Sequence, residues 1–345
     1  MKIPVSVATH PYDVMVGAGV RREISALISQ RAPHARQSVV LVDEALIGQP
    51  WCDFDGLVIG IAGGESSKSL AHLEAVANDL SRRGVTRHDV LIAVGGGATT
   101  DFVGLLGALY QRGIAVINVP TTVAGMADAA IGGKTGVNIA AGKNLLGTFT
   151  QPAAVVCDLD TLATLPSRDA VAGEAEMVKC WLLSQRSSDD YLRATFEARL
   201  EHAISLKAQV VATDEREGST RALLNYGHTL GHAIEAHYFE RADAPRHGEA
   251  VSMGLVFADM LALELGRCDV SRVAQTRQIL SDLGLPVSLP PEIDLDESLS
   301  FMRRDKKAHG GFTFVLAGPT GYEVVANIDE VMVRRCLQKF MEESR

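Results

Sequence analysis

The segment VGGGATTD, residues 94–101, follows a run of apolar residues (Val90–Val94) and precedes a helical stretch (Asp101–Gln111). Glycines between a strand and a helix let the backbone approach a pyrophosphate, whose charge the helix N-terminus stabilises. The segment is not the G-x-G-x-x-G fingerprint, so by itself it does not identify a dinucleotide site. It does indicate a strand followed by a helix, the repeating unit of a parallel α/β sheet.

The N-terminal half of the chain repeats this alternation of short apolar runs and helical stretches. A further helix is expected at Ser69–Arg83. Buried strands are expected at Ser38–Val42, Gly56–Ile61, Val90–Val94, Val116–Val119 and Ala154–Cys157. The pattern predicts a parallel sheet with helices on its faces.

After Leu165 and Pro166, β-branched runs become rare and helical patterns dominate. Helices are expected at Ala203–Asp214, Arg221–Phe239, His247–Leu265 and Arg272–Leu283, and two short strands at Phe312–Leu316 and Tyr322–Val325. We therefore predict an α/β protein of two domains. The first, residues 1–165, is a Rossmann-like parallel-sheet domain, and the second, residues 166–345, is mainly α-helical.

The composition narrows the classes of function. At 345 residues the chain can build two cores. Its formal net charge of −9, with no basic run, argues against nucleic acid as a partner. We expect no membrane span and no signal peptide. The five scattered cysteines include no C-x-x-C, which favours reduced thiols in the cytoplasm. A small anionic substrate remains compatible, because a local pocket can be basic.

Two more glycine- or threonine-containing segments follow predicted strands. They are GGESSK, residues 63–68, and PTT, residues 120–122. Loops at the carboxyl ends of parallel strands meet at one edge of the sheet, so with residues 94–101 they favour a nucleotide site. GGKTG, residues 132–136, and GKN, residues 142–144, suggest an anion cradle, but they lack the Walker A spacing, and such loops are common.

A candidate metal site begins with RALLNYGHTLGHAIE, residues 221–235, which we expect to form one helix. His228 and His232, four residues apart, would share one side of it, with Asn225 and Arg221 one and two turns earlier. Such a pair is about as often a polar helix face as a zinc site, and it is not the H-E-x-x-H motif.

Whether His228 and His232 belong to a metal site depends on ligands elsewhere in the chain. Glu176, His228 and His247 together would give two histidines and a carboxylate, with positions open for a substrate. Taken alone, Glu176 and Lys179, one helical turn apart, suggest a surface ion pair.

In combination and in this order, these motifs resemble the 3-dehydroquinate synthase family. The matching segments are GGESSK, GGGATTD, KTGVN, GKN, AE-x2-K, NYGHTLGH, HGEAV and DKK, spread over roughly residues 43–316. The resemblance implies conversion of 3-deoxy-D-arabino-heptulosonate 7-phosphate to 3-dehydroquinate and phosphate in the shikimate pathway. NAD would oxidise the substrate transiently, followed by phosphate elimination, reduction, ring opening and aldol closure. It also implies a cytoplasmic homodimer without nucleic-acid or membrane partners.

The resemblance assigns roles residue by residue. Ligands of a divalent metal, zinc or cobalt, are Glu176, His228 and His247, while His232 is catalytic rather than a ligand. The other catalytic positions are Glu217, Lys134, Lys179 and Asn144. The substrate-binding positions are Arg112, Lys134, Asn144, Lys207, Arg221, Asn225 and Lys306. The NAD-binding positions are Asp43, Glu65, Lys68, Gly96, Gly97, Asp101, Thr121, Thr122, Asp128, Lys143, Thr161 and Thr164.

Two groups of alternatives stay open. A sister cyclase would act on an amino analogue of this substrate or on sedoheptulose 7-phosphate. Since the latter has no carboxylate, Lys207 and Arg221 favour a carboxylated substrate, but no residue excludes the amino analogue. A metal-dependent polyol or glycerol-phosphate dehydrogenase would share the sheet and the metal, but would not call for the lysine-containing segments at residues 132–144.

Overall fold

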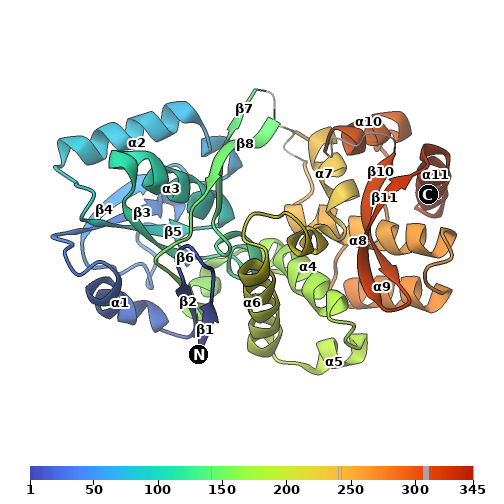
Figure 1. Cartoon of the computed structure of the whole chain (residues 1–345), viewed down its shortest axis with the longest axis horizontal. Helices are drawn as coiled ribbons and strands as arrows, with labels where there is room; N and C mark the ends of the chain where they lie inside the picture. The colour runs from blue at the N-terminus through green and yellow to red at the C-terminus, as the bar shows by residue number, and fades with distance from the viewer. Residues whose placement is uncertain (141, 240, 242, 306–310, 345) are drawn as a thin grey trace. The chain divides into compact units, whose positions relative to one another are not determined.

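The computed structural model describes residues 1–140, 142–239, 241, 243–305 and 311–344, apart from the side chains of residues 304 and 305 (Figure 1). The chain divides into two compact units. The first comprises Met1–Ala170 and Ile204–Arg216, and the second Val171–Ala203 and Glu217–Arg345. The functional division into residues 1–165 and 166–345 stays a prediction.

The first unit is built on a seven-stranded sheet of order β1-β2-β9-β6-β5-β3-β4. Its strands are β1 (Lys2–Val5), β2 (Tyr12–Gly17), β3 (Ser38–Asp43), β4 (Leu57–Ile61), β5 (Val90–Gly95), β6 (Ala115–Pro120) and β9 (Ala154–Asp158). Only β1 is antiparallel to its neighbour; the other pairs are parallel. The five predicted strands are confirmed, and the β1–β2 hairpin is an addition.

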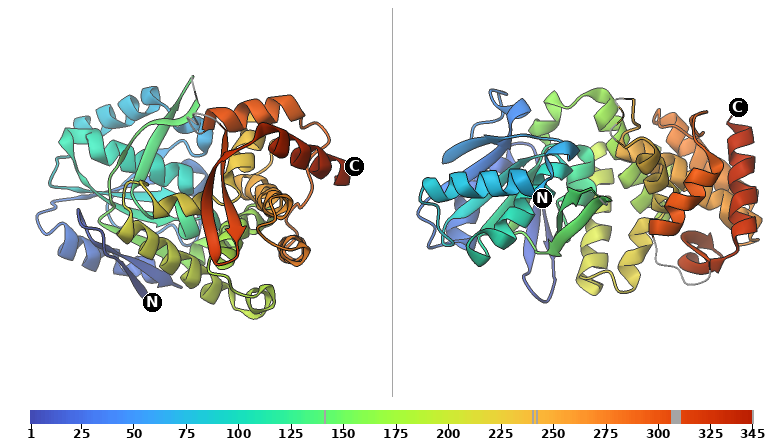
Figure 2. Two further views of the ribbon diagram at one scale, coloured as in Figure 1. Left: turned by 45° about the vertical axis from the view of Figure 1, so that its right-hand side comes forward. Right: turned by 90° about the horizontal axis from the view of Figure 1, so that it is seen from above.

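Helices cover both faces of this sheet: α1 (Ile24–Arg31), α2 (Leu70–Arg82) and α3 (Gly97–Leu109) (Figures 1 and 2). On one face Leu91 belongs to a core with Leu80 of α2 and Leu106 of α3. On the other, Ile92 shares a core with Leu27 of α1. Every residue of β5 is buried, which explains why its sequence is a continuous apolar run without alternation.

The GGKTG and GKN segments are not loops. They lie at an antiparallel ribbon of β7 (Lys134–Ile139) and β8 (Gly142–Phe149). A Cβ on Gly147 would lie 2.0 Å from the carbonyl oxygen of Thr135, so the two strands can pair this closely only with glycine there. The prediction of a loop was wrong because glycine and lysine obscured a strand whose outer face is exposed.

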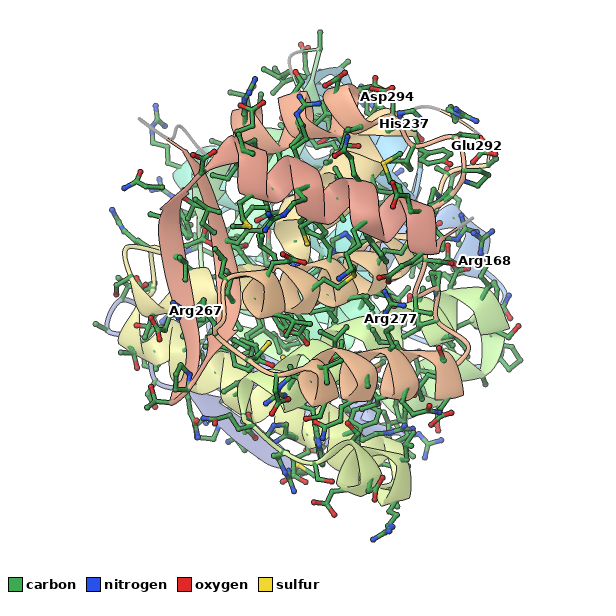
Figure 3. All side chains as sticks on the ribbon, turned by 90° about the vertical axis from the view of Figure 1, so that its right-hand side faces the viewer. Arg168, His237, Arg267, Arg277, Glu292 and Asp294 are labelled. Atoms are coloured by element: carbon green, nitrogen blue, oxygen red, sulfur yellow. The ribbon has the colours of Figure 1, made fainter. Side chains whose placement is uncertain are left out.

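The second unit is mainly helical, with one ribbon of β10 (Phe312–Gly318) and β11 (Gly321–Ile328). Its helices are α4 (Ser167–Leu183), α5 (Ser188–Arg193), α7 (His228–His237), α8 (His247–Glu264), α9 (Val270–Asp282), α10 (Leu295–Asp305) and α11 (Glu330–Glu343), while α6 (Phe196–Thr213) continues into the first unit. Helix α8 packs against α7, α9, α11 and β10, and its residues are buried almost throughout. In Figure 3, Arg267 lies beside the ribbon, where its Nε donates to the carbonyl oxygen of Ala317 at 3.2 Å.

The single helix expected over residues 221–239 is wrong. A 3-10 turn (Thr220–Asn225) comes first, Gly227 adopts a left-handed conformation with φ of 79°, and α7 begins only at His228. A Cβ on Gly227 would lie 2.8 Å from the Leu255 side chain, so glycine permits the close approach to α8. Arg221 and Asn225 therefore do not continue the helical stripe of His228.

Among the described residues, no helix is both long enough and apolar enough to cross a membrane.

Candidate metal centre and active-site residues

Three side chains of the second unit form a cluster that could hold a metal ion. Glu176 lies within α4, whereas His228 and His247 are the first residues of α7 and α8. The Nε2 atoms of His228 and His247 lie 3.4 and 3.3 Å from Oε1 of Glu176. The candidate ligand atoms all lie within 4.8 Å of one another. The structure thus brings together the three predicted ligands.

The carboxylate of Glu176 fits a metal ion. Its side chain is 1% exposed, and within the described part of the chain neither oxygen has a hydrogen-bond partner of good geometry, although the Lys179 Nζ lies 2.5 Å from Oε2. A buried carboxylate without hydrogen bonds is costly, and a divalent cation would offset that cost. Two imidazoles and a carboxylate suit zinc or cobalt and leave positions for a substrate. Glu176 and Lys179 are both buried, so they are not the surface ion pair that their spacing alone suggested.

The charges around this cluster favour the metal-binding forms of Glu176 and His228, but not that of His247. Burial raises the pKa of Glu176, but the positive charge of Lys179 outweighs it and holds the pKa well below its usual range. Burial and Lys179 lower the pKa of His228, which keeps that imidazole neutral. Burial lowers the pKa of His247, but Glu235 and Glu176 more than reverse this, so a metal would compete with a proton there.

His232 lies beside the cluster without belonging to the ligand set found among the described residues. Its ring centroid is 5.4 Å from that of His228 and 6.5 Å from that of His247. The position is compatible with a histidine that acts near a metal rather than on it, and this role stays a prediction.

Of three more predicted residues of the second unit, Arg221 and Asn225 belong to the 3-10 turn before α7, and Glu217 precedes it. Arg221 is 2% exposed, and Asn225 donates from Nδ2 to Oε1 of Glu217 at 2.9 Å. The Glu217 backbone has a φ of 60°. Asn225 and Glu217 are therefore in contact, whereas their sequence separation gave no sign of it.

In the first unit, three predicted residues meet at a fourth, Lys68, which is 2% exposed. Its Nζ donates to Asp101 Oδ2 at 2.8 Å and to Asn144 Oδ1 at 2.5 Å, and lies 3.5 Å from Glu65 Oε1. Burial raises the pKa of Asp101 to about 6, while Lys68 acts in the opposite direction. The GGESSK, GGGATTD and GKN segments thus converge on one buried cation.

Sequence analysis missed Asn138 as a member of this group. Its Nδ2 donates to Glu65 Oε1 at 2.9 Å, and its Oδ1 accepts from the backbone N–H of Asn144 at 2.9 Å. The position of Asn138 in the KTGVN motif was the sequence feature that could have indicated its membership of this group.

The glycine turn packs on the segment that follows β6. A Cβ on Gly97 would lie 2.8 Å from Ala129 Cβ, and one on Gly96 would lie 3.2 Å from Thr122. The N–H of Thr121 donates to the carbonyl oxygen of Gly95 at 2.9 Å. The turn therefore joins β5, α3 and the PTT segment, as the carboxyl ends of neighbouring parallel strands predict.

Asp128 and Lys207, assigned to NAD and to the substrate respectively, contact each other. Lys207 is 5% exposed, and its Nζ lies 2.5 Å from both the carbonyl oxygen and Oδ1 of Asp128. A buried lysine that bridges backbone and carboxylate is held in a fixed position rather than left mobile.

The remaining predicted residues of the first unit lie in separate places. Asp43 caps a turn by accepting from the N–H of Ala45, and a Cβ on Gly63 would meet its carboxylate. Thr161 donates to the carbonyl oxygen of Asp158, and Thr164 accepts from Trp51 Nε1 at 3.1 Å. Arg112, Lys134 and Lys143 have exposed side chains. Lys306 lies outside the described residues.

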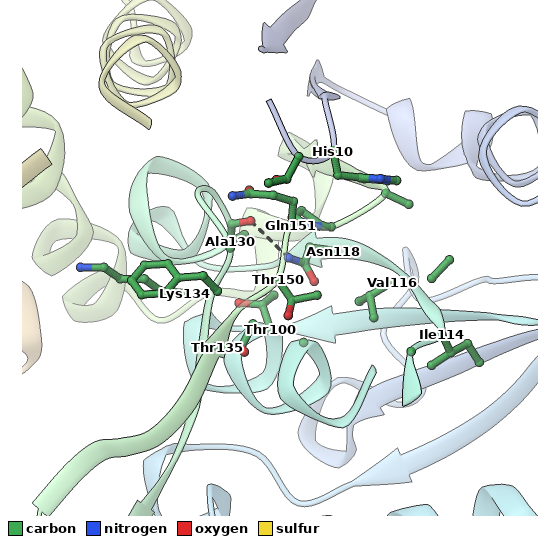
Figure 4. Close-up of a pocket in the computed structure, with 18 of the residues that line it drawn as sticks. His10, Thr100, Ile114, Val116, Asn118, Ala130, Lys134, Thr135, Thr150 and Gln151 are labelled. Carbon is green, nitrogen blue, oxygen red and sulfur yellow. Dashed lines mark hydrogen bonds between the residues drawn. The ribbon is translucent and has the colours of Figure 1, made fainter. Parts of the chain in front are cut away.

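A pocket of about 440 Å³ in the first unit has Lys134 at its edge (Figure 4). The residues that line it include Val116 and Asn118 of β6 and Thr100 of α3. Asn118 is buried and donates from Nδ2 to the carbonyl oxygen of Ala130 at 3.2 Å. The sequence did not predict this pocket, because its walls come from segments far apart in the chain.

Family profiles match most of the chain. The profile for the 3-dehydroquinate synthase N-terminal region matches residues 58–172, and that for the C-terminal region matches residues 171–308. A protein of Amycolatopsis mediterranei named as a candidate aminodehydroquinate synthase is 42% identical over 342 residues, covering 99% of this chain and 95% of that protein. The 3-dehydroquinate synthase of Thermobifida fusca is 42% identical over 308 residues, covering 83% and 81%.

Solved structures share the fold. A 2-deoxy-scyllo-inosose synthase complexed with carbaglucose-6-phosphate, NAD⁺ and Co²⁺ has a TM-score of 0.85 at 24% identity, with 99% of this chain and 100% of that chain covered. A 2-epi-5-epi-valiolone synthase of Streptomyces hygroscopicus, with NAD⁺ and Zn²⁺ bound, has a TM-score of 0.82 at 25% identity, with 96% and 97% covered. From its sequence matches, the chain belongs to the 3-dehydroquinate synthase family.

Proposed function

We propose that this chain converts 3-deoxy-D-arabino-heptulosonate 7-phosphate to 3-dehydroquinate and phosphate, with NAD and a divalent metal. The observation that carries the proposal is the cluster of Glu176, His228 and His247, whose buried carboxylate pairs with Lys179 but finds no hydrogen-bond partner of good geometry among the described residues. Membership of the 3-dehydroquinate synthase family supports the reaction.

Glu176, His228 and His247 are proposed to hold zinc or cobalt, the ions bound in two structures of similar fold. When bound, such an ion polarises the substrate hydroxyl that is oxidised. Lys179 supplies a positive charge 2.5 Å from Glu176. His232, whose ring centroid lies 5.4 Å from that of His228, is proposed to exchange a proton with the substrate.

The sheet unit is proposed to bind NAD, which would supply the transient oxidation of the substrate. The turn at Gly96 and Gly97, before helix α3, suits a pyrophosphate. Asp43, Glu65, Lys68, Asp101, Thr121, Thr122, Asp128, Lys143, Thr161 and Thr164 complete the proposed nucleotide side. Through its hydrogen bond to Asn144, the buried Lys68 would hold the start of β8 in place.

Cationic side chains are proposed to bind the two charged ends of the substrate. Lys and Arg pair strongly with carboxylates and phosphates. Lys207 and Arg221 fit the carboxylate, and Arg112, Lys134 and Lys306 fit the phosphate. Asn144, Glu217 and Asn225 are proposed to contact the hydroxyl groups or to move protons.

An amino analogue of this substrate is the second candidate, because the candidate aminodehydroquinate synthase matches 99% of the chain. It would carry the same carboxylate and phosphate, so the same cations would bind it. None of the described contacts distinguishes an amine from a hydroxyl.

We further propose a cytoplasmic homodimer with Arg112 near the subunit boundary. This arginine is exposed, with a φ of 66°, just after α3. Sedimentation equilibrium of the wild-type protein tests the dimer, and a monomer at micromolar concentration would contradict it.

The experiment that tests the function measures phosphate release with NAD⁺ and zinc from three substrates: 3-deoxy-D-arabino-heptulosonate 7-phosphate, its amino analogue and sedoheptulose 7-phosphate. We expect fast release from the first. Release from the amino analogue alone would move the protein to the second candidate, and release from sedoheptulose 7-phosphate alone would contradict a carboxylated substrate.

A further inference from the structure

The two imidazoles of the metal centre are oriented by different groups. Nδ1 of His228 lies 3.0 Å from the backbone carbonyl oxygen of Tyr226. Nδ1 of His247 lies 3.0 Å from the carboxylate oxygen Oε2 of Glu235. In each ring the other nitrogen, Nε2, is the atom that faces Glu176.

We propose that Glu235 is a positioning residue of the metal centre, which keeps the proton of His247 on Nδ1 and its Nε2 directed at the ion. The inference rests on the metal centre of the proposed function. A carboxylate accepts from Nδ1–H, so it selects one tautomer and one ring orientation.

The greater solvent exposure of the His247 side chain explains why its ring needs Glu235 as a partner. The side chain of His228 is only 9% exposed, so packing and a backbone carbonyl restrict its ring together. The side chain of His247 is 39% exposed, and packing alone leaves its ring more freedom. The capping contact from the Arg246 N–H to Glu249 Oε2, 2.8 Å, fixes the start of α8 but not the ring.

Glu235 is itself well placed for this task. It lies in the last turns of α7, the helix whose first residue is the other histidine ligand, and its side chain is 17% exposed. One helix therefore supplies a ligand from one end and the support for a second ligand from the other. A charge-assisted hydrogen bond in such a partly buried place is stronger than a neutral one.

The chain contains a matched control. Nδ1 of His237, also on α7 and labelled in Figure 3, lies 2.6 Å from Oε2 of Glu297. This pair has the same chemistry, but neither residue belongs to the ligand cluster. Glu297→Gln removes the same charge from the same kind of contact as Glu235→Gln.

The test is the zinc affinity of the full-length wild-type protein and both variants, measured by competition with a chromophoric chelator. We expect Glu235→Gln to bind zinc about 10–100-fold more weakly, the range for outer-shell partners of metal ligands. Glu297→Gln should stay within about twofold of the wild type, and the metal-free proteins should unfold at similar temperatures. Unchanged affinity in Glu235→Gln, or an equal loss in both variants, would overturn the inference.

A second measurement needs no variant. In the zinc-loaded wild-type protein, long-range ¹H–¹⁵N correlation should show the His247 proton on Nδ1. A proton on Nε2 would overturn the inference while leaving a bound metal. Absence of zinc binding by the wild type would overturn the metal centre and, with it, this inference.

Discussion

Lys68 in the sheet unit and Glu176 in the helical unit are both buried charges, with side chains 1% exposed, but they differ in how the protein satisfies them. Lys68 donates to Asp101 and Asn144 and lies near Glu65. Glu176 lies near one lysine and two imidazoles, but it has no hydrogen bond of good geometry to any residue that the structure describes. Burial of a charge is tolerated when its partners are complete. The protein itself supplies the hydrogen-bond acceptors of Lys68. The carboxylate of Glu176, in contrast, would be stabilised further by a bound metal cation.

The largest loss of metal binding and activity is expected on substitution of Glu176, the buried charge that would be stabilised by a metal ion. Glu176→Gln removes the carboxylate of the ligand cluster found among the described residues. We expect zinc affinity to fall by more than about 100-fold, beyond the range for an outer-shell partner, and phosphate release to fall with it. Equilibrium metal binding and the phosphate assay check this. Wild-type affinity in this variant would remove Glu176 from the metal centre.

Lys68→Met tests how much the buried group around Lys68 contributes to the stability of the protein. Removing one partner of a buried ion pair typically costs about 3–5 kcal/mol, because the other charge is left uncompensated. We expect a loss at the lower end of that range, since the Asp101 side chain is 20% exposed. Urea unfolding measures it, and Lys68→Met combined with Asp101→Asn should recover part of the loss. No change in the free energy of unfolding would show that the pair is not structural.

A third buried carboxylate, Asp259 of α8, is satisfied by neutral groups. It accepts from the hydroxyls of Tyr226 and Thr276, both at 2.7 Å. Burial raises its pKa to about 6 from 3.8, and the two hydrogen bonds only partly oppose this.

Because the folded protein binds this proton more tightly than the unfolded chain, the Asp259 contribution to stability is lost as pH rises from about 4 to about 6. A shift of about two pKa units corresponds to about 3 kcal/mol. Urea unfolding at pH 4 and pH 7 should show a steeper fall with rising pH in the wild type than in Asp259→Asn. Equal slopes would contradict the raised pKa.

The smallest effect is expected at Lys143, which neighbours the Lys68 group but is exposed. Lys143→Met should change the free energy of unfolding by no more than about 0.5 kcal/mol. Its proposed contact with NAD should instead appear as weaker binding of the nucleotide in calorimetry. A large loss of stability would mean that Lys143 belongs to the buried arrangement.

The parts of the fold that could be predicted are those in which one physical rule decides the local pattern. Strand β5 is apolar throughout because both faces are covered, and its turn into α3 follows from three glycines. The ribbon of β7 and β8 was missed because its glycines serve close strand pairing. The start of α7 was missed because the break at Gly227 depends on contact with Leu255 of a later helix.

The residues of the candidate site likewise fall into those that the sequence could predict and those that depend on packing. Glu176, His228 and His247 could be proposed from residue type and family resemblance. Glu235 stands in the very segment that drew attention to the site, yet its partner His247 is twelve residues away on another helix. Such a pairing depends on how α7 and α8 pack, which no local pattern encodes.

The most direct measurement follows phosphate and NADH together while the wild-type protein acts on 3-deoxy-D-arabino-heptulosonate 7-phosphate with NAD⁺ and zinc. A cyclase that regenerates its cofactor should release phosphate without accumulating NADH, lose this activity to a chelator and regain it with zinc. Absence of phosphate from this substrate and its amino analogue, with NADH accumulating on a polyol, would show a dehydrogenase instead.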